Sequence, residues 1–119
     1  MDPVGLASNL TTLVGFALQS SKELHQTLDS FKKQDSYIRE FKTELEALET
    51  VLGSLRKIAD DTDIELYPLK LPLLQCGSAC AEFKAIIAKH ISRSNTIEFK
   101  TLIASYKSTI VAALINTNM

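Results

Sequence analysis

Residues 36–59 read SYIREFKTELEALETVLGSLRKIA, and this stretch decides the fold. Its apolar side chains recur at alternating spacings of three and four residues, at Ile38, Phe41, Leu45, Leu48, Leu52, Leu55 and Ala59. That spacing places them on one face of an α-helix. Val51 and Ile58 widen the face, which suits an antiparallel bundle better than the narrow seam of a coiled coil. Asp35 or Ser36 is expected to cap the helix, which should end near Ala59.

The segment before this helix is almost free of charge. Residues 3–21 include no charged side chain in 19 positions, but several polar residues interrupt the run, so it is not a membrane span. Asp2 as N-cap and Pro3 at the first helical position predict a helix that begins there. The apolar stripe of this helix is either buried at the centre of the bundle or makes contact with a membrane or an apolar partner. In the second case the effector face would comprise Val4, Leu6, Leu10, Leu13, Val14 and Phe16.

Two further helices are predicted in the second half of the chain. Pro68 and Pro72 exclude uninterrupted helix before a third helix at about 73–91. The apolar positions expected on this third helix are Leu73, Cys76, Cys80, Phe83, Ile87 and His90. Asn95, with Glu98 three residues on, is expected to cap a fourth helix that shows Lys100 and Lys107 to solvent. The buried positions expected on the fourth helix are Phe99, Leu102, Ile103, Tyr106, Ile110, Ala113 and Leu114.

These patterns define the predicted fold class. Strand signals are absent, and 119 residues with 45% apolar and 23% charged side chains are enough for one hydrophobic core. We therefore predict an all-α protein, an antiparallel bundle of four or five helices that forms a single domain over residues 1–119.

Charge is distributed unevenly although the net charge is only -1. Residues 1–34 are neutral, residues 35–65 carry -5, and residues 66–119 carry +4. The acidic second helix can lie beside the basic half and neutralise it. Alternatively, the basic half offers cations to an anionic partner or lipid. Those cations are Lys84, Lys89, Arg93, Lys100 and Lys107. Without a dense basic stripe or stacking aromatics, nucleic acid is not an expected partner.

No set of residues in the sequence indicates catalysis. Cys76 and Cys80, four apart in one helix, are poorly placed for a disulfide and are expected as free thiols. With His25 and His90 they make only a weak zinc signal. The carboxylate pairs Glu40 with Glu44 and Glu46 with Glu49 are expected on the exposed side of their helix. Phosphate-binding and dinucleotide motifs are absent, so we expect neither an enzyme nor a cofactor. An acid near the start where a signal peptide needs positive charge favours a cytoplasmic protein.

Three segments carry a family resemblance: MDPVGLAS at 1–8, LPLLQCGSACAEF at 71–83 and YKSTI at 106–110. Together they resemble the N-terminal domain of fungal signal-transducing NTPases (STAND proteins) of the HeLo-like group. In that pattern a longer segment, commonly with a Trp, precedes the last helix; here only residues 90–103 fill this region, and the chain has no Trp. The resemblance implies an NLR-like helical effector domain ahead of a nucleotide-binding or repeat region. It also implies oligomerisation, membrane damage and programmed cell death in some members, but no catalytic residues.

The leading hypothesis is a non-enzymatic signalling module whose first helix is released toward a membrane or another copy. The protein would then be cytoplasmic and recruited to an anionic membrane, with itself or downstream NTPase and repeat domains as protein partners. The alternative is a protein–protein adaptor or homo-oligomerisation module without lipid activity. A third class is a carrier that holds an apolar ligand between its helices.

Overall fold

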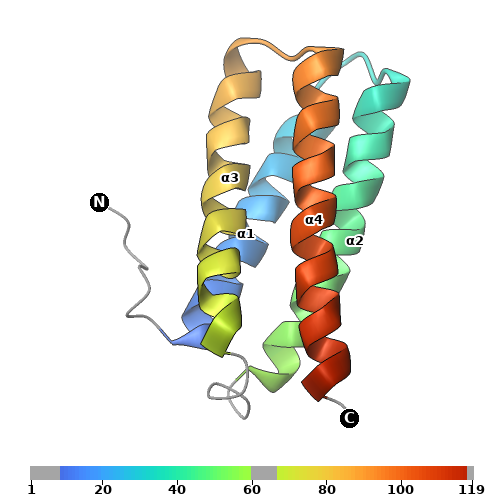
Figure 1. Ribbon diagram of the computed structural model, residues 1–119. Helices are drawn as coiled ribbons and strands as arrows, with labels where there is room; N and C mark the ends of the chain where they lie inside the picture. Colours follow the sequence, from blue (N-terminus) through green and yellow to red (C-terminus); the bar gives the residue numbers. More distant parts are fainter. Residues whose placement is uncertain (1–8, 60–66, 118–119) are drawn as a thin grey trace.

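Four α-helices and one short 3-10 helix make up the computed structural model, which describes residues 9–59 and 67–117. The elements are α1 (Leu10–Asp29), α2 (Ser36–Ile58), η1 (Tyr67–Leu69), α3 (Lys70–Lys89) and α4 (Arg93–Thr117). Helices that follow one another along the chain run in opposite directions (Figure 1). No strand occurs in these two described ranges. The predicted all-α antiparallel bundle is therefore confirmed.

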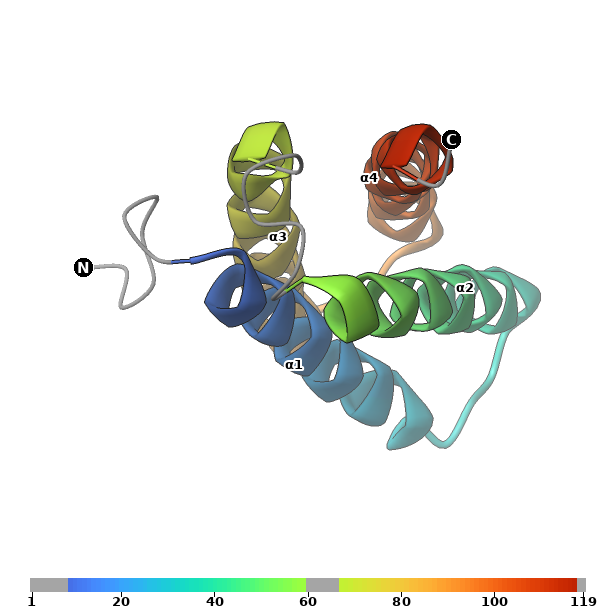
Figure 2. The same ribbon diagram turned by 90° about the horizontal axis from the view of Figure 1, so that it is seen from below.

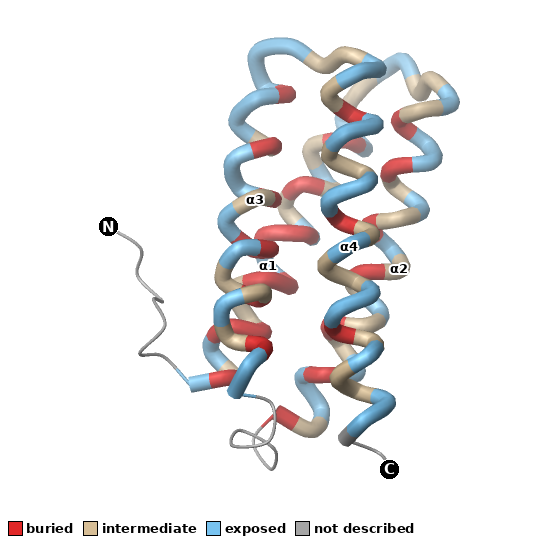
Figure 3. Tube along the Cα trace, in the orientation of Figure 1, coloured by how far each residue is buried: buried red, intermediate tan, exposed pale blue. Residues whose placement is uncertain are grey.

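The helices form two layers, which Figure 2 shows end-on: α1 and α2 in one, α3 and α4 in the other. Between the layers, α1 packs mainly against α3, and α2 packs mainly against α4. The buried residues face the space between the layers, and the outward sides of α3 and α4 are exposed (Figure 3). The apolar stripe of each helix thus meets the stripe of a helix from the other layer.

Helix α2 matches its prediction closely. All seven residues of its predicted stripe are buried, from Ile38 to Ala59. At the end of the bundle where α2 begins, Phe41 meets Phe83 of α3 and Phe99 of α4, with ring centroids 5.5 and 5.8 Å away. Phe83 and Phe99 stack on each other at 4.3 Å. This aromatic cluster joins three helices, and such pairs add stabilisation beyond the area that they bury.

The first helix begins later than predicted. Asn9 has an extended backbone and caps α1, because its side-chain Oδ1 accepts a hydrogen bond from the amide of Thr12 at 2.8 Å. A helix that begins at Pro3 cannot continue through Asn9, so that prediction is wrong. Asn is among the best N-cap residues, and it satisfies an amide that the helix itself leaves unpaired. The predicted cap at Asp2 lies outside the described residues.

The starts of α3 and α4 also differ from prediction. Pro72 lies in the first turn of α3, where its missing N–H removes no helical hydrogen bond. The cap of α4 is Ser92 and not Asn95. The amide of Ser92 donates to Oδ1 of Asn95, and the amide of Asn95 donates to Oγ of Ser92, both at 3.1 Å. This reciprocal pair is a capping box in which Asn takes the place usually held by Glu or Gln.

Two residues that were predicted to be buried are exposed. His90 is the C-cap of α3, and its extended backbone takes it off the helical stripe. Leu102 is 38% exposed. Because α4 packs mainly against α2, the buried face of α4 is narrower than its apolar pattern suggested, and Leu102 falls outside it.

Candidate functional site

The predicted effector face lies inside the bundle wherever the structure describes it. Leu10, Leu13 and Val14 are fully buried in the core. Phe16 is half-buried, and its ring lies against the backbone of Gly77 in α3. A Cβ atom at Gly77 would come within 3.0 Å of two atoms of this ring, so the close contact of α1 with α3 requires glycine there. Val4 and Leu6 lie outside the described residues.

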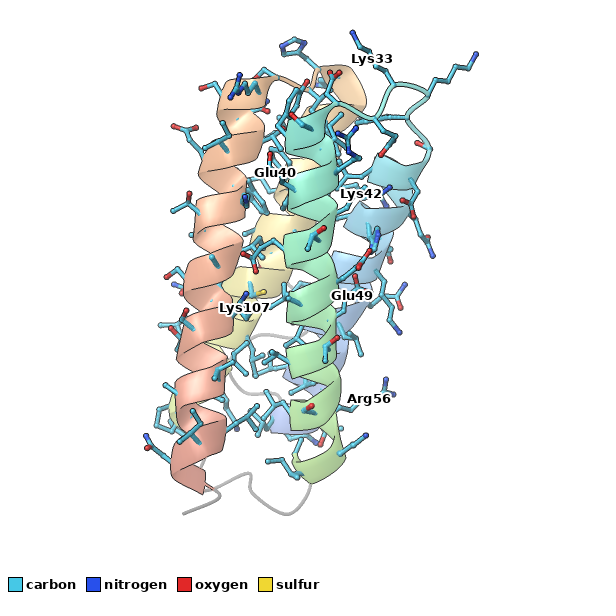
Figure 4. All side chains as sticks on the ribbon, turned by 90° about the vertical axis from the view of Figure 1, so that its right-hand side faces the viewer. Lys33, Glu40, Lys42, Glu49, Arg56 and Lys107 are labelled. Carbon is cyan, nitrogen blue, oxygen red and sulfur yellow. The ribbon has the colours of Figure 1, made fainter. Side chains whose placement is uncertain are left out.

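Three of the five predicted anion-binding cations are paired with acids of the other layer. Lys84 lies 3.1 Å from Glu23 of α1, and Lys100 lies 3.7 Å from Glu40 of α2. Lys107 lies 2.5 Å from Glu44, between α4 and α2 (Figure 4). The side chains of Lys107 and Glu44 are only 29% and 14% exposed, so the prediction that these two residues face solvent is wrong. The side chain of Lys100 is 36% exposed. The two halves of opposite charge neutralise each other across the layers.

Lys89 and Arg93 are the two predicted cations that stay exposed. They flank the short connection between α3 and α4. Within residues 9–59 and 67–117, no ion pair forms at either of them. Any contact of this basic set with an anion would therefore begin at these two residues.

A groove lies along the seam between α2 and α4, and we call it the α2–α4 groove. Its volume is about 390 Å³. Its walls are Ser36, Tyr37, Glu40 and Glu44 from α2 and Arg93, Thr96, Ile97, Lys100, Thr101 and Ala104 from α4. A second hollow of about 330 Å³ adjoins it, shares Glu40, Glu44 and Lys100 with it, and is also lined by Lys107. The groove thus combines apolar walls with a few charged groups, as small-molecule sites do.

A polar cluster around His25 joins α1 to α2, which sequence reasoning missed. The Nδ1 atom of His25 lies 2.9 Å from Glu49, and its Nε2 atom lies 3.8 Å from both Asp29 and Glu46. Lys42 bridges to Asp29 at 2.6 Å, which lowers the pKa of that carboxyl. The side chain of Glu49 is 20% exposed, so its predicted exposure is wrong (Figure 4). The cluster holds the first two helices together, and no spacing in the sequence pointed to it.

The two cysteines are buried free thiols, as predicted. The neighbouring thiol of Cys76 and burial both raise the pKa of Cys80, so its reactive thiolate is suppressed. Among the residues that the structure describes, no group of three or more His, Cys, Asp or Glu side chains could hold a metal ion.

Exposed apolar side chains are concentrated in one layer. The large hydrophobic residues exposed in the described chain all belong to η1, α3 and α4, and none to α1 or α2. They are Tyr67, Leu71, Ile86, Ile97, Leu102 and Ile115. The helical stretch Tyr67–Lys89 is also long and apolar enough to cross a membrane. In its most apolar 18 residues, however, a third of the residues are buried in the bundle. A core helix of a bundle meets the same two criteria, so this indication is weak.

The fold and these surfaces define the chain as a small all-α helical domain. A family model described as the N-terminal domain of the pigment biosynthesis cluster protein PigL matches residues 1–98, and the chain belongs to this family. An N-terminal domain of fungal pigment cluster proteins agrees with the predicted fungal type of N-terminal domain. No curated protein and no solved structure shows a significant match.

Proposed function

We propose that the chain is a non-enzymatic signalling domain of the HeLo-like group that self-associates through its α3–α4 layer while the bundle stays intact. The observation that carries this proposal is that, among the residues the structure describes, the exposed large hydrophobic side chains are confined to η1, α3 and α4. Exposed apolar residues gathered on one part of a surface mark sites that another molecule covers. In a STAND-like protein, a nucleotide-binding or repeat region would control this association.

The charges of the α3–α4 layer favour a second copy as the covering molecule. Its exposed charged residues in the described chain are two acids and two bases, namely Glu82, Glu98, Lys89 and Arg93. Two copies related by a two-fold axis present the same patch to each other, and this patch is neutral in sum. Depletion of charge at the centre is also typical of protein–protein interfaces. An anionic lipid surface would find less attraction, because Lys84, Lys100 and Lys107 are already paired.

The energy needed to release α1 supports an intact bundle. Five leucines of α1 are buried, at positions 10, 13, 18, 24 and 28. Exposing one such side chain costs about 1.5–3 kcal/mol, so exposing five costs on the order of 10 kcal/mol. A whole domain is typically stable by about 5–15 kcal/mol. Release of α1 alone would therefore cost about as much as unfolding the bundle.

The test is the solution mass, measured by sedimentation equilibrium over a wide range of protein concentration. The wild type is expected to dimerise, and the double variant Ile86→Lys with Leu102→Lys is expected to stay monomeric. Thr50→Lys, which adds a charge at an exposed position of α2, is the matched control and should dimerise like the wild type. Circular dichroism verifies that each variant is folded.

A parallel measurement adds vesicles of phosphatidylcholine and phosphatidylserine. A wild type that stays monomeric at every concentration overturns the proposal. If that monomer also binds the anionic vesicles, a membrane function takes its place. If the double variant dimerises like the wild type, self-association uses another surface, and the proposal for the α3–α4 layer is overturned.

A further inference from the structure

We propose that the α2–α4 groove binds a small anionic aromatic molecule, a carboxylate or sulfonate with one or two fused rings. The groove shares Arg93 and Ile97 with the exposed surface of the α3–α4 layer. The proposal does not depend on self-association. It rests on a cation at one end of the groove that has no ion-pair partner among the described residues, on the apolar walls beside it, and on a volume of molecular size.

Arg93 is the group that would bind the anion. It is exposed, it lines the groove, and the described part of the chain offers it no acid within ion-pair distance. The other charges of the groove are already engaged: Glu40 pairs with Lys100, and Glu44 pairs with Lys107. Arg93 is therefore the charged residue of the lining that has no ion-pair partner among the described residues. A guanidinium presents two parallel N–H groups, which fit a carboxylate or sulfonate.

The apolar walls would receive the rings. Tyr37 contributes a half-buried aromatic ring from α2, and Ile97 and Ala104 face it from α4. Ile97 is 46% exposed, and a bound molecule would cover it. Because Ile97 lies four residues after Arg93, both residues are on the same side of α4.

The size of the groove favours a small molecule over a peptide helix. Its volume of about 390 Å³ lies within the range of small-molecule sites. Toward the C-terminal half of α4, the ion pair of Lys107 with Glu44 crosses from α4 to α2. Lys107 lines the second hollow and not the groove, whereas Glu44 lines both.

The experiment uses two fluorescent probes that share their rings and differ in charge. They are 1-anilinonaphthalene-8-sulfonate, which is anionic, and N-phenyl-1-naphthylamine, which lacks the sulfonate. The sulfonate probe is expected to bind saturably with one site per chain, and the neutral probe about tenfold more weakly, as the loss of one charged hydrogen bond predicts. Binding should shift the NMR signals of the Ile97 methyl groups.

Two variants test the site and one serves as control. Arg93→Gln should lower the affinity for the sulfonate probe about tenfold. Ala104→Phe should prevent its binding, because the larger side chain fills the groove. Lys89→Gln removes an exposed cation that does not line the groove and should change binding less than twofold. Equal binding of the two probes, or sulfonate binding unchanged in both Arg93→Gln and Ala104→Phe, overturns the proposal. The dimer-disrupting variant should keep its probe binding, which separates this result from the fate of self-association.

Discussion

At the scale of single residues, the contact of Phe16 with Gly77 predicts opposite effects for two glycine substitutions. Gly77→Ala should lower the free energy of unfolding by about 1–3 kcal/mol, because the new methyl group collides with the Phe16 ring. At Gly53 in α2, an added Cβ atom has no neighbour within 4 Å. Gly53→Ala should therefore raise the free energy of unfolding by up to about 1 kcal/mol through better helix propensity. Urea unfolding of both variants measures the difference. Stabilisation by Gly77→Ala would show that α1 and α3 are less closely packed.

The buried thiols give a second prediction at this scale. Burial and the raised pKa of Cys80 should leave both cysteines unmodified when the native protein meets iodoacetamide at pH 8. The same reagent should modify both within minutes in 6 M guanidinium chloride. Intact mass spectrometry counts the labels. Fast labelling of the native protein would reveal local opening of α3.

At the scale of helix pairs, two carboxylates should make stability depend on pH. Hydrogen bonds from Gln19 and then Lys84 lower the pKa of Glu23, and one from Lys42 lowers the pKa of Asp29. A lowered pKa stabilises the fold above the value of the unfolded chain, about 4, and this stabilisation disappears as the pH falls through the folded value. Urea unfolding at pH 5 and pH 3 measures the loss.

The matched variant for this effect is the double substitution Glu23→Gln with Asp29→Asn. Both carboxylates are largely exposed, so together they should account for less than about 1 kcal/mol of the difference between the two pH values. The double variant should lose stability less steeply between pH 5 and pH 3. An unchanged slope would place the acid sensitivity in other carboxylates.

Helices with a regular spacing of apolar residues could be predicted from the sequence. The residues at which the helices begin and end were predicted less well. The stripe of α2 is regular over six turns, so every member from Ile38 to Ala59 was correctly predicted to be buried. The starts of α1 and α4 were wrong because Asn9 and Ser92 compete with other good caps nearby. Several residues can cap a helix, and the choice depends on where packing stops.

The candidate site was predictable only in part, because ion pairs between layers depend on distance in space. Nothing in the order of residues places Lys107 beside Glu44, 63 positions away. The charge of each half suggested neutralisation in general, but partners could not be assigned. The α2–α4 groove likewise needs both helices in place, although Arg93 and Lys100 were already candidate anion contacts.

At the scale of the whole molecule, the two layers have different surfaces. In the described chain the first layer holds α1, whose leucines are buried, and exposes no large hydrophobic residue. The second layer exposes all six of them. The uncharged segment at residues 3–21 suggested that the first helix is the part of the protein that contacts a membrane or another copy. Packing places its apolar side in the core and leaves the exposed apolar surface to α3 and α4, which is why the proposed association uses the second layer.

The last prediction follows from the central place of α1. If α1 is an integral part of the core, its slowest amide protons should exchange only through global unfolding, with the same free energy as those of α2. Five buried leucines make separate detachment of α1 about as costly as unfolding the whole bundle. Native-state hydrogen exchange in low urea measures both helices in one sample. If α1 exchanged several kcal/mol more easily than α2, it would be a detachable element, and an effector role for this helix would regain its basis.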